Sequence, residues 1–84
     1  MFKIMVVEDD VSLKNIIAKC LTKWGHDVHQ IENLENIIEE FKNYNPELVL
    51  LDINLPFYDG FHWCNEIRKI SKVPIIFISS RNSN

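Results

Sequence analysis

The chain has 84 residues, of which 46% are hydrophobic and 25% charged, so we expect one small globular domain and exclude a disordered segment or a coiled coil. The formal net charge of -3 argues against an electrostatic grip on nucleic acid or on an anionic membrane. No apolar run approaches the ~20 residues that span a bilayer. No signal peptide is visible at the N-terminus, and two cysteines are too few for a disulfide framework. We therefore expect a cytoplasmic protein that makes no membrane contact.

Four short apolar runs are typical of buried strands. They span Phe2–Val7, Asp27–Ile31, Glu47–Asp52 and Val73–Ile78, and the second is the weakest. Pro74 is compatible with the last run because it stands at the opening of the strand.

Three segments between these runs carry apolar residues at helical spacing. They cover Leu13–Trp24, Leu34–Phe41 and Phe61–Ile70. Gly25 stands where a left-handed residue would end the first helix, and Asn33 is placed to cap the start of the second.

Strict alternation of strand and helix, with strands apolar on both faces, predicts an α/β fold with an open parallel sheet and helices on both sides. In such sheets, sites form at the carboxyl ends of the strands. Three of the four runs end there in polar groups: Glu8-Asp9-Asp10, Asp52 and Ser79-Ser80.

Carboxylates crowded at one edge of a sheet repel one another, and a divalent cation relieves that repulsion. Mg²⁺ prefers oxygen ligands and is commonly held by one or two carboxylates together with a phosphate. A carboxylate nucleophile can form an acyl phosphate, so Asp52 beside Glu8 and Asp9 predicts a Mg²⁺-dependent phosphoryl site. The Ser79 hydroxyl would complete it.

Four motifs occur in order along the whole chain: Val6-Val7-Glu8-Asp9-Asp10, Leu50-Leu51-Asp52-Ile53-Asn54-Leu55-Pro56, Asp59-Gly60 and Ile76-Phe77-Ile78-Ser79-Ser80-Arg81. Together they resemble the receiver domain of bacterial two-component response regulators. The Leu-Pro and Ser-Ser-Arg patterns are similar to the OmpR/PhoB-like class, and residues 58–64 are similar to regulators of bacitracin and antimicrobial-peptide responses.

The resemblance implies a flavodoxin-like topology with strand order 2-1-3-4, the fifth strand being missing. It implies that Asp52 accepts a phosphoryl group from a sensor histidine kinase. Asp9 would bind Mg²⁺ directly, Glu8 would hold it through water, and Asn54 would offer its backbone carbonyl.

Further roles follow from the same resemblance. Ser79 would be the switch hydroxyl, and the backbone N–H of Ser80 would contact a phosphoryl oxygen. The side chains of Asn54 and Arg81 stand where family members tune dephosphorylation.

Receiver domains continue into a fourth helix, a fifth strand and a fifth helix. We therefore expect residues 1–84 to be an incomplete receiver domain that covers the region of the first four strands. DNA binding would belong to an effector domain outside this chain. The edge of the fourth strand, Val73–Ile78, and an uncovered face of the first helix predict self-association of the 84 residues.

Three alternatives remain open. A Mg²⁺-dependent phosphohydrolase of the haloacid-dehalogenase type would carry an acid at position 54, where this chain has Asn54. A flavodoxin-like binding module would need a Gly-, Ser- or Thr-rich loop after the first strand, where Glu8, Asp9 and Asp10 would repel a phosphate. A receiver-like docking module that is never phosphorylated is the third.

Several chemistry-bearing residues have structural interpretations. Asp10 is expected to cap the first helix. His26 and His29 lack an acid or cysteine partner at zinc spacing, and His62 is expected to face solvent. Four further side chains are expected in or near the core: Cys20, Trp24, Trp63 and Cys64.

Overall fold

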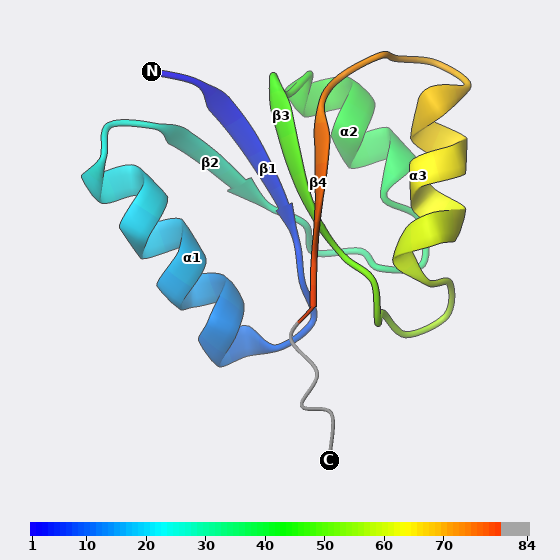
Figure 1. The fold of residues 1–84 in the computed structure, drawn as a ribbon, viewed down its shortest axis with the longest axis horizontal. Coiled ribbons are helices and arrows are strands. Elements are labelled where there is room, and N and C mark those ends of the chain that lie inside the picture. Colours follow the sequence, from blue (N-terminus) through cyan, green and yellow to red (C-terminus); the bar gives the residue numbers. More distant parts are fainter. Residues whose placement is uncertain (80–84) are drawn as a thin grey trace.

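A computed structural model describes residues 1–79 of the chain. Strands and helices alternate from the first element to the last (Figure 1). The elements are β1 Lys3–Val7, α1 Val11–Lys23, β2 Asp27–Gln30, α2 Ile38–Tyr44, β3 Leu48–Asp52, α3 Gly60–Arg68 and β4 Ile75–Ile78. The predicted order of elements is confirmed.

All strand pairs are parallel, and the sheet order is β2-β1-β3-β4. Figure 1 shows α1 on one side of the sheet and α2 and α3 on the other. This is the predicted flavodoxin-like arrangement. Parallel strands leave all their carboxyl ends at one edge, so the fold itself gathers the residues that follow β1, β3 and β4.

Alternate residues of the central strands supply the two buried faces. Met5, Val7, Val49 and Leu51 are fully buried in one cluster with side chains of α2 and α3. Ile4 and Val6 are also buried, and strand alternation turns them to the α1 side. Both faces of β1 are therefore covered, which explains why its sequence is apolar throughout.

The start of α2 differs from the prediction. Asn33 does not cap it: its Oδ1 accepts a hydrogen bond from Glu35 N at 3.0 Å, and its carbonyl accepts one from Asn36 N. This local turn competes with the helix, which begins only at Ile38. The end of α1 agrees with the prediction, since Gly25 has a φ of 91°.

The sheet covers only part of the apolar side of α1. The helix packs against β1 and β2, and Ala18 is its one buried residue. Ile16 is 65% exposed, Trp24 is 76% exposed and Cys20 is exposed as well. The predicted core positions of Cys20 and Trp24 are therefore wrong, because no described element covers that flank of the helix.

The third helix matches the prediction more closely. Trp63 is 4% exposed, and Cys64 packs against the core cluster. The helical spacing extends to Ile70 in the sequence and places it on the apolar side with Trp63, but Ile70 lies beyond the end of α3 and is half exposed, so burial predicted from that spacing is wrong. Among residues 1–79, no helix is long and apolar enough to cross a membrane.

The first residue of α3 lies directly against the end of β3. A Cβ atom at Gly60 would stand 2.3 Å from the carbonyl oxygen of Asp52 and 3.0 Å from the Cα atom of Ile53. The backbone N–H of Gly60 donates to the carbonyl of Ile53 at 2.9 Å. A side chain would force these backbones apart, so this position requires glycine for close approach and not for a positive φ.

We expect Gly60→Ala to destabilise the fold by about 1–3 kcal/mol through overpacking against rigid backbone. Gly25→Ala is the matched control, since the Cβ there meets nothing within 4 Å and the cost comes only from its positive φ. Urea denaturation of both variants measures the difference. Equal destabilisation would contradict the close-approach explanation.

Candidate functional site

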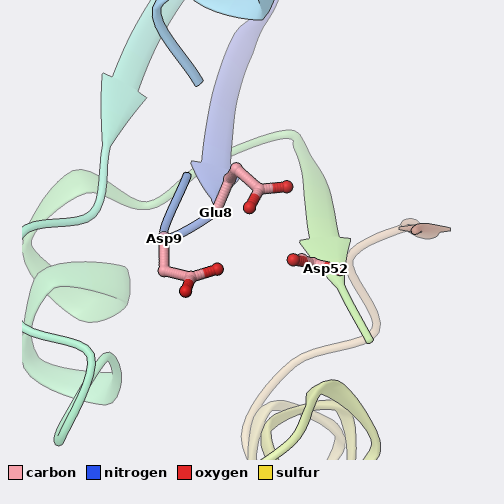
Figure 2. A group of neighbouring side chains, drawn as sticks. All are labelled: Glu8, Asp9 and Asp52. Atoms are coloured by element: carbon pink, nitrogen blue, oxygen red, sulfur yellow. The ribbon is translucent and has the colours of Figure 1, made fainter. Parts of the chain in front are cut away.

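Three carboxylates meet at the carboxyl edge of the sheet. Glu8 and Asp9 directly follow β1, and Asp52 is the last residue of β3. The register Val7↔Leu51 places these positions side by side. One carboxylate oxygen from each of the three lies within 4.8 Å of the others, and Figure 2 shows the side chains pointing into the same space.

Three consecutive acids after β1 have three different surroundings. Glu8 is 1% exposed, and its Oε2 accepts a hydrogen bond from the backbone N–H of Asp10 at 3.0 Å. Asp9 is exposed and joins the carboxylate group. Asp10 caps α1, because its Oδ1 accepts from Leu13 N at 3.0 Å. The structural interpretation of Asp10 is confirmed.

Asp52 is fully buried and held by the loop that follows it. Its Oδ1 accepts a hydrogen bond from the backbone N–H of Asn54 at 3.1 Å. The loop is closed by Gly60, whose N–H donates to Ile53 as described above. Asp59 then caps α3 by accepting from His62 N at 2.9 Å. The Asp59-Gly60 pair therefore belongs to the helix start, which the sequence motif alone did not indicate.

The crowding has an electrostatic cost. The pKa of Glu8 is raised from 4.5 to about 7, mainly by burial; the Asp10 N–H opposes the rise, and the neighbouring carboxylates of Asp52 and Asp9 contribute to it. Glu8 Oε1 is buried and accepts no hydrogen bond within residues 1–79. A buried acceptor without a donor is what a bound cation would satisfy.

The donor set fits a hard divalent cation. All three side chains offer carboxylate oxygens, which Mg²⁺ prefers, and the exposure of Asp9 leaves room for water ligands. A cation would also reduce the repulsion that raises the Glu8 pKa. The structure thus brings together the three carboxylates that the sequence analysis named as candidate metal ligands.

Two of the other predicted site residues, Ser79 and Asn54, are also found at or near this edge of the sheet. Ser79 follows β4 and is exposed, and the register Asp52↔Ile78 places it next to the end of β3. Asn54 is exposed on the loop after Asp52. Ser80 and Arg81 lie outside the described residues.

The histidines lie elsewhere. His29 Nε2 is 2.8 Å from Glu40 Oε1, and His26 Nδ1 accepts a hydrogen bond from Phe2 N. His62 is half-buried and stacks on Tyr58 with ring centroids 4.3 Å apart, so its predicted exposure is wrong. Aromatic stacking on the preceding loop covers it, a contact that helical periodicity does not report.

Comparison of the sequence with known proteins identifies a family and several relatives. The response regulator receiver domain family matches residues 4–84. The sensory transduction protein BceR of Halalkalibacterium halodurans is 54% identical over 82 residues, which are 98% of this chain and 36% of that protein. The chain thus spans little more than a third of the length of this relative.

Solved structures agree with the sequence matches. The N-terminal domain of the nisin resistance regulator NsrR, a lantibiotic response regulator, is 38% identical with a TM-score of 0.86, over 98% of this chain and 69% of that one. A chain from the complex of histidine kinase ThkA with response regulator protein TrrA is 31% identical, with a TM-score of 0.84 over 98% and 72% of the respective chains.

The raised pKa of Glu8 predicts a pH-dependent stability. The folded state binds the Glu8 proton more tightly than the unfolded state does. Protonated Glu8 therefore adds to the free energy of unfolding; this stabilisation is complete below pH 4.5 and is lost as the pH rises through about 7. The loss is on the order of 3 kcal/mol. Glutamine does not ionise. In metal-free buffer, the free energy of unfolding of Glu8→Gln minus that of the wild type should therefore be larger at mildly alkaline pH than at acidic pH. Urea denaturation across this range would contradict the assignment if the difference stayed constant.

The cation fit predicts that Asp9 and Asp10 differ in their effect on metal binding. Asp9→Asn should weaken Mg²⁺ binding at least about tenfold, because it removes a charged oxygen ligand. Asp10→Asn should bind Mg²⁺ nearly as the wild type does, since asparagine still caps α1. Isothermal titration with Mg²⁺ measures both. Equal losses in the two variants would mean that only the general acidity of the loop matters.

Proposed function

Since this chain belongs to the family of response regulator receiver domains, we propose that it accepts a phosphoryl group on Asp52. The observation that carries the proposal is the group of Glu8, Asp9 and Asp52 carboxylates at the carboxyl edge of the sheet. Asp52 is the central member by position, because it ends the strand that lies between β1 and β4.

The proposed reaction is a transfer from a phosphohistidine. A carboxylate oxygen of Asp52 attacks the phosphorus, a new O–P bond forms, and the P–N bond to the imidazole breaks with the electron pair leaving on nitrogen. The hydrogen bond from Asn54 N to Asp52 Oδ1 fixes the plane of the carboxylate before the attack. Holding the nucleophile in one orientation lowers the entropic cost of the step.

Glu8 and Asp9 would hold the metal. Bound Mg²⁺ would neutralise charge on the phosphoryl oxygens and allow a dianion to approach a group of carboxylates. The backbone carbonyl of Asn54 is proposed as a further ligand, and Glu8 is proposed to act through water. The chain would thereby take part in its own phosphorylation without turning over an independent substrate.

The remaining roles concern the phosphorylated state. Ser79 is proposed as the hydroxyl that turns toward the phosphoryl group, and its place beside the end of β3 supports this role. Ser80 would donate its backbone N–H to a phosphoryl oxygen. The side chains of Asn54 and Arg81 would set the rate at which the acyl phosphate is hydrolysed.

The proposed partner is a sensor histidine kinase, and the solved complex of ThkA with TrrA supports this class of donor. We propose that the phosphoryl group regulates transcription through a DNA-binding effector domain outside these residues, in the cytoplasm, with residues 1–84 forming part of a receiver domain. The likeness to NsrR, which is a lantibiotic response regulator, supports a subtype that responds to antimicrobial peptides.

Two other functions fit the residues less well. A phosphohydrolase of the haloacid-dehalogenase type would have its second acid where Asn54 stands, and its nucleophile on the first strand, whereas Asp52 ends β3. A flavodoxin-like cofactor site would bind phosphate after β1, where Glu8 and Asp9 contribute negative charge. The site geometry therefore favours a phosphoacceptor.

The proposal predicts that Asp52→Asn abolishes phosphate uptake, because an amide is a poor nucleophile. The chain is incubated with acetyl phosphate and Mg²⁺, and mass spectrometry measures the added phosphoryl group. Asp59→Asn is the matched control, since it alters a nearby exposed acid and keeps the cap of α3. Undiminished uptake by Asp52→Asn would exclude Asp52 as the acceptor, and omission of Mg²⁺ should suppress uptake by the wild type.

A further inference from the structure

The loop between β3 and α3 contains a strained residue. Phe57 has a φ of 70°, in the left-handed region that residues with a side chain rarely adopt. Across it, the backbone N–H of Tyr58 donates to the carbonyl of Pro56 at 2.8 Å. A hydrogen bond between residues two apart, with a positive φ at the residue between them, is the strained form of the γ-turn. Such a conformation persists only where surrounding contacts hold it.

The ring of Tyr58 makes contacts that hold one end of this turn. It stacks on the ring of His62 with centroids 4.3 Å apart and an angle of 19° between the ring planes. It also meets the ring of Trp63 edge to face at 5.5 Å. Aromatic pairs in these geometries stabilise a structure beyond the area they bury. Tyr58 is therefore fixed against two side chains of α3, although it is 49% exposed.

The two rings of α3 are themselves held in place. Trp63 is 4% exposed and belongs to the core cluster, together with side chains of β1 and β3. The ring of His62 packs against Trp63 with centroids 4.8 Å apart, and its backbone N–H is bound by the cap at Asp59. Tyr58 thus ties the loop to the packed core of the molecule.

The same loop orients the carboxylate of Asp52. The backbone N–H of Asn54 donates to Asp52 Oδ1, and the Asn54 side chain is exposed. The position of this N–H is therefore set by the residues on either side of it. Ile53 before it is hydrogen-bonded to β4, whereas Leu55 after it is only partly buried against the core cluster. The anchored turn at Tyr58 supplies the remaining hold on this side of the loop.

We propose that Tyr58 is a positioning residue for the phosphoacceptor carboxylate of Asp52. Its ring, held by α3, keeps the strained turn in place, and the turn keeps the Asn54 N–H on the carboxylate. This inference rests on the proposed phosphorylation of Asp52. Without the ring the turn would relax, and the carboxylate would sample orientations from which it cannot attack phosphorus. Tyr58 therefore affects the rate of transfer and not the binding of the phosphodonor.

The first test measures the rate of phosphorylation by acetyl phosphate with Mg²⁺, using mass spectrometry. Tyr58→Ala should lower the maximal rate at least about threefold and leave the half-saturating concentration of acetyl phosphate unchanged, because orientation and not binding is lost. Tyr58→Phe keeps the ring and should retain the wild-type rate. Phe57→Ala is the matched control, since it removes a neighbouring ring that is 68% exposed.

Circular dichroism at the assay temperature establishes that each variant is folded, so that a lower rate does not reflect an unfolded fraction. An unchanged maximal rate in Tyr58→Ala would overturn the proposal. An equal loss in Phe57→Ala would overturn it as well, because that variant leaves the stack on α3 intact.

A second set of variants changes the other side of the stack. His62→Ala removes the ring on which Tyr58 lies, without altering the loop, and should slow phosphorylation as Tyr58→Ala does. The double variant should be no slower than either single variant, because both remove the same interaction. His62→Phe restores a stacking partner and should restore the rate. Independent, additive losses would contradict a role that acts through the stack.

Hydrogen exchange of the Asn54 N–H separates failure of this inference from failure of the proposed function, because it requires no phosphoryl transfer. Measured by NMR on the unphosphorylated chain, this exchange should be faster in Tyr58→Ala than in the wild type or Tyr58→Phe. Unchanged exchange would refute the hold of Tyr58 on the loop, even where Asp52 is phosphorylated. If the wild type took up no phosphate on Asp52, the proposed function would fail, and faster exchange in Tyr58→Ala would still support that hold.

Discussion

The parallel pairing of β1 with β3 is the constraint on which the candidate site depends. It places the residues after Val7 beside the end of β3, so that Glu8, Asp9 and Asp52 share one small volume. Each of these acids is unremarkable in the sequence when taken alone. Their proximity follows from strand direction, because only parallel strands leave two carboxyl ends at the same edge.

Placing these carboxylates close together costs free energy, and the packing of the rest of the fold offsets that cost. Glu8 and Asp52 are buried, and burial together with like charge disfavours the ionised form of Glu8. The apolar strands beneath them and the helices on both faces hold the carboxylates together despite this cost. Groups that are arranged to bind a ligand commonly lower the stability of the folded protein, because they are not arranged to interact favourably with one another.

Backbone contacts hold Asp52 in place at the end of β3. Asn54 N binds one carboxylate oxygen, and Gly60 packs against the carbonyl of Asp52 with no space for a Cβ atom. α3 therefore begins against the residue that is proposed to carry the phosphoryl group. The edge of β4 and the exposed flank of α1 show the opposite situation, since apolar side chains such as Ile76 and Trp24 remain in contact with solvent.

The sequence by itself determined the order of the elements, the parallel sheet and the acids at its carboxyl edge. Periodicity and alternation are local properties, and the strand runs, the cap at Asp10 and the turn at Gly25 depend only on neighbouring residues. The resemblance to receiver domains added the roles proposed for Asp52, Asp9 and Ser79.

Only the tertiary structure decided which apolar residues are buried. Cys20, Trp24 and Ile70 have the spacing of core residues, yet they are exposed, because burial depends on whether another element covers that side of a helix. Likewise, the Asp59-Gly60 pair is typical of a turn in sequence, but in the structure Gly60 allows α3 to approach the end of β3 closely. Periodicity identifies the apolar face of a helix, and the packing of distant segments determines how much of that face is removed from water.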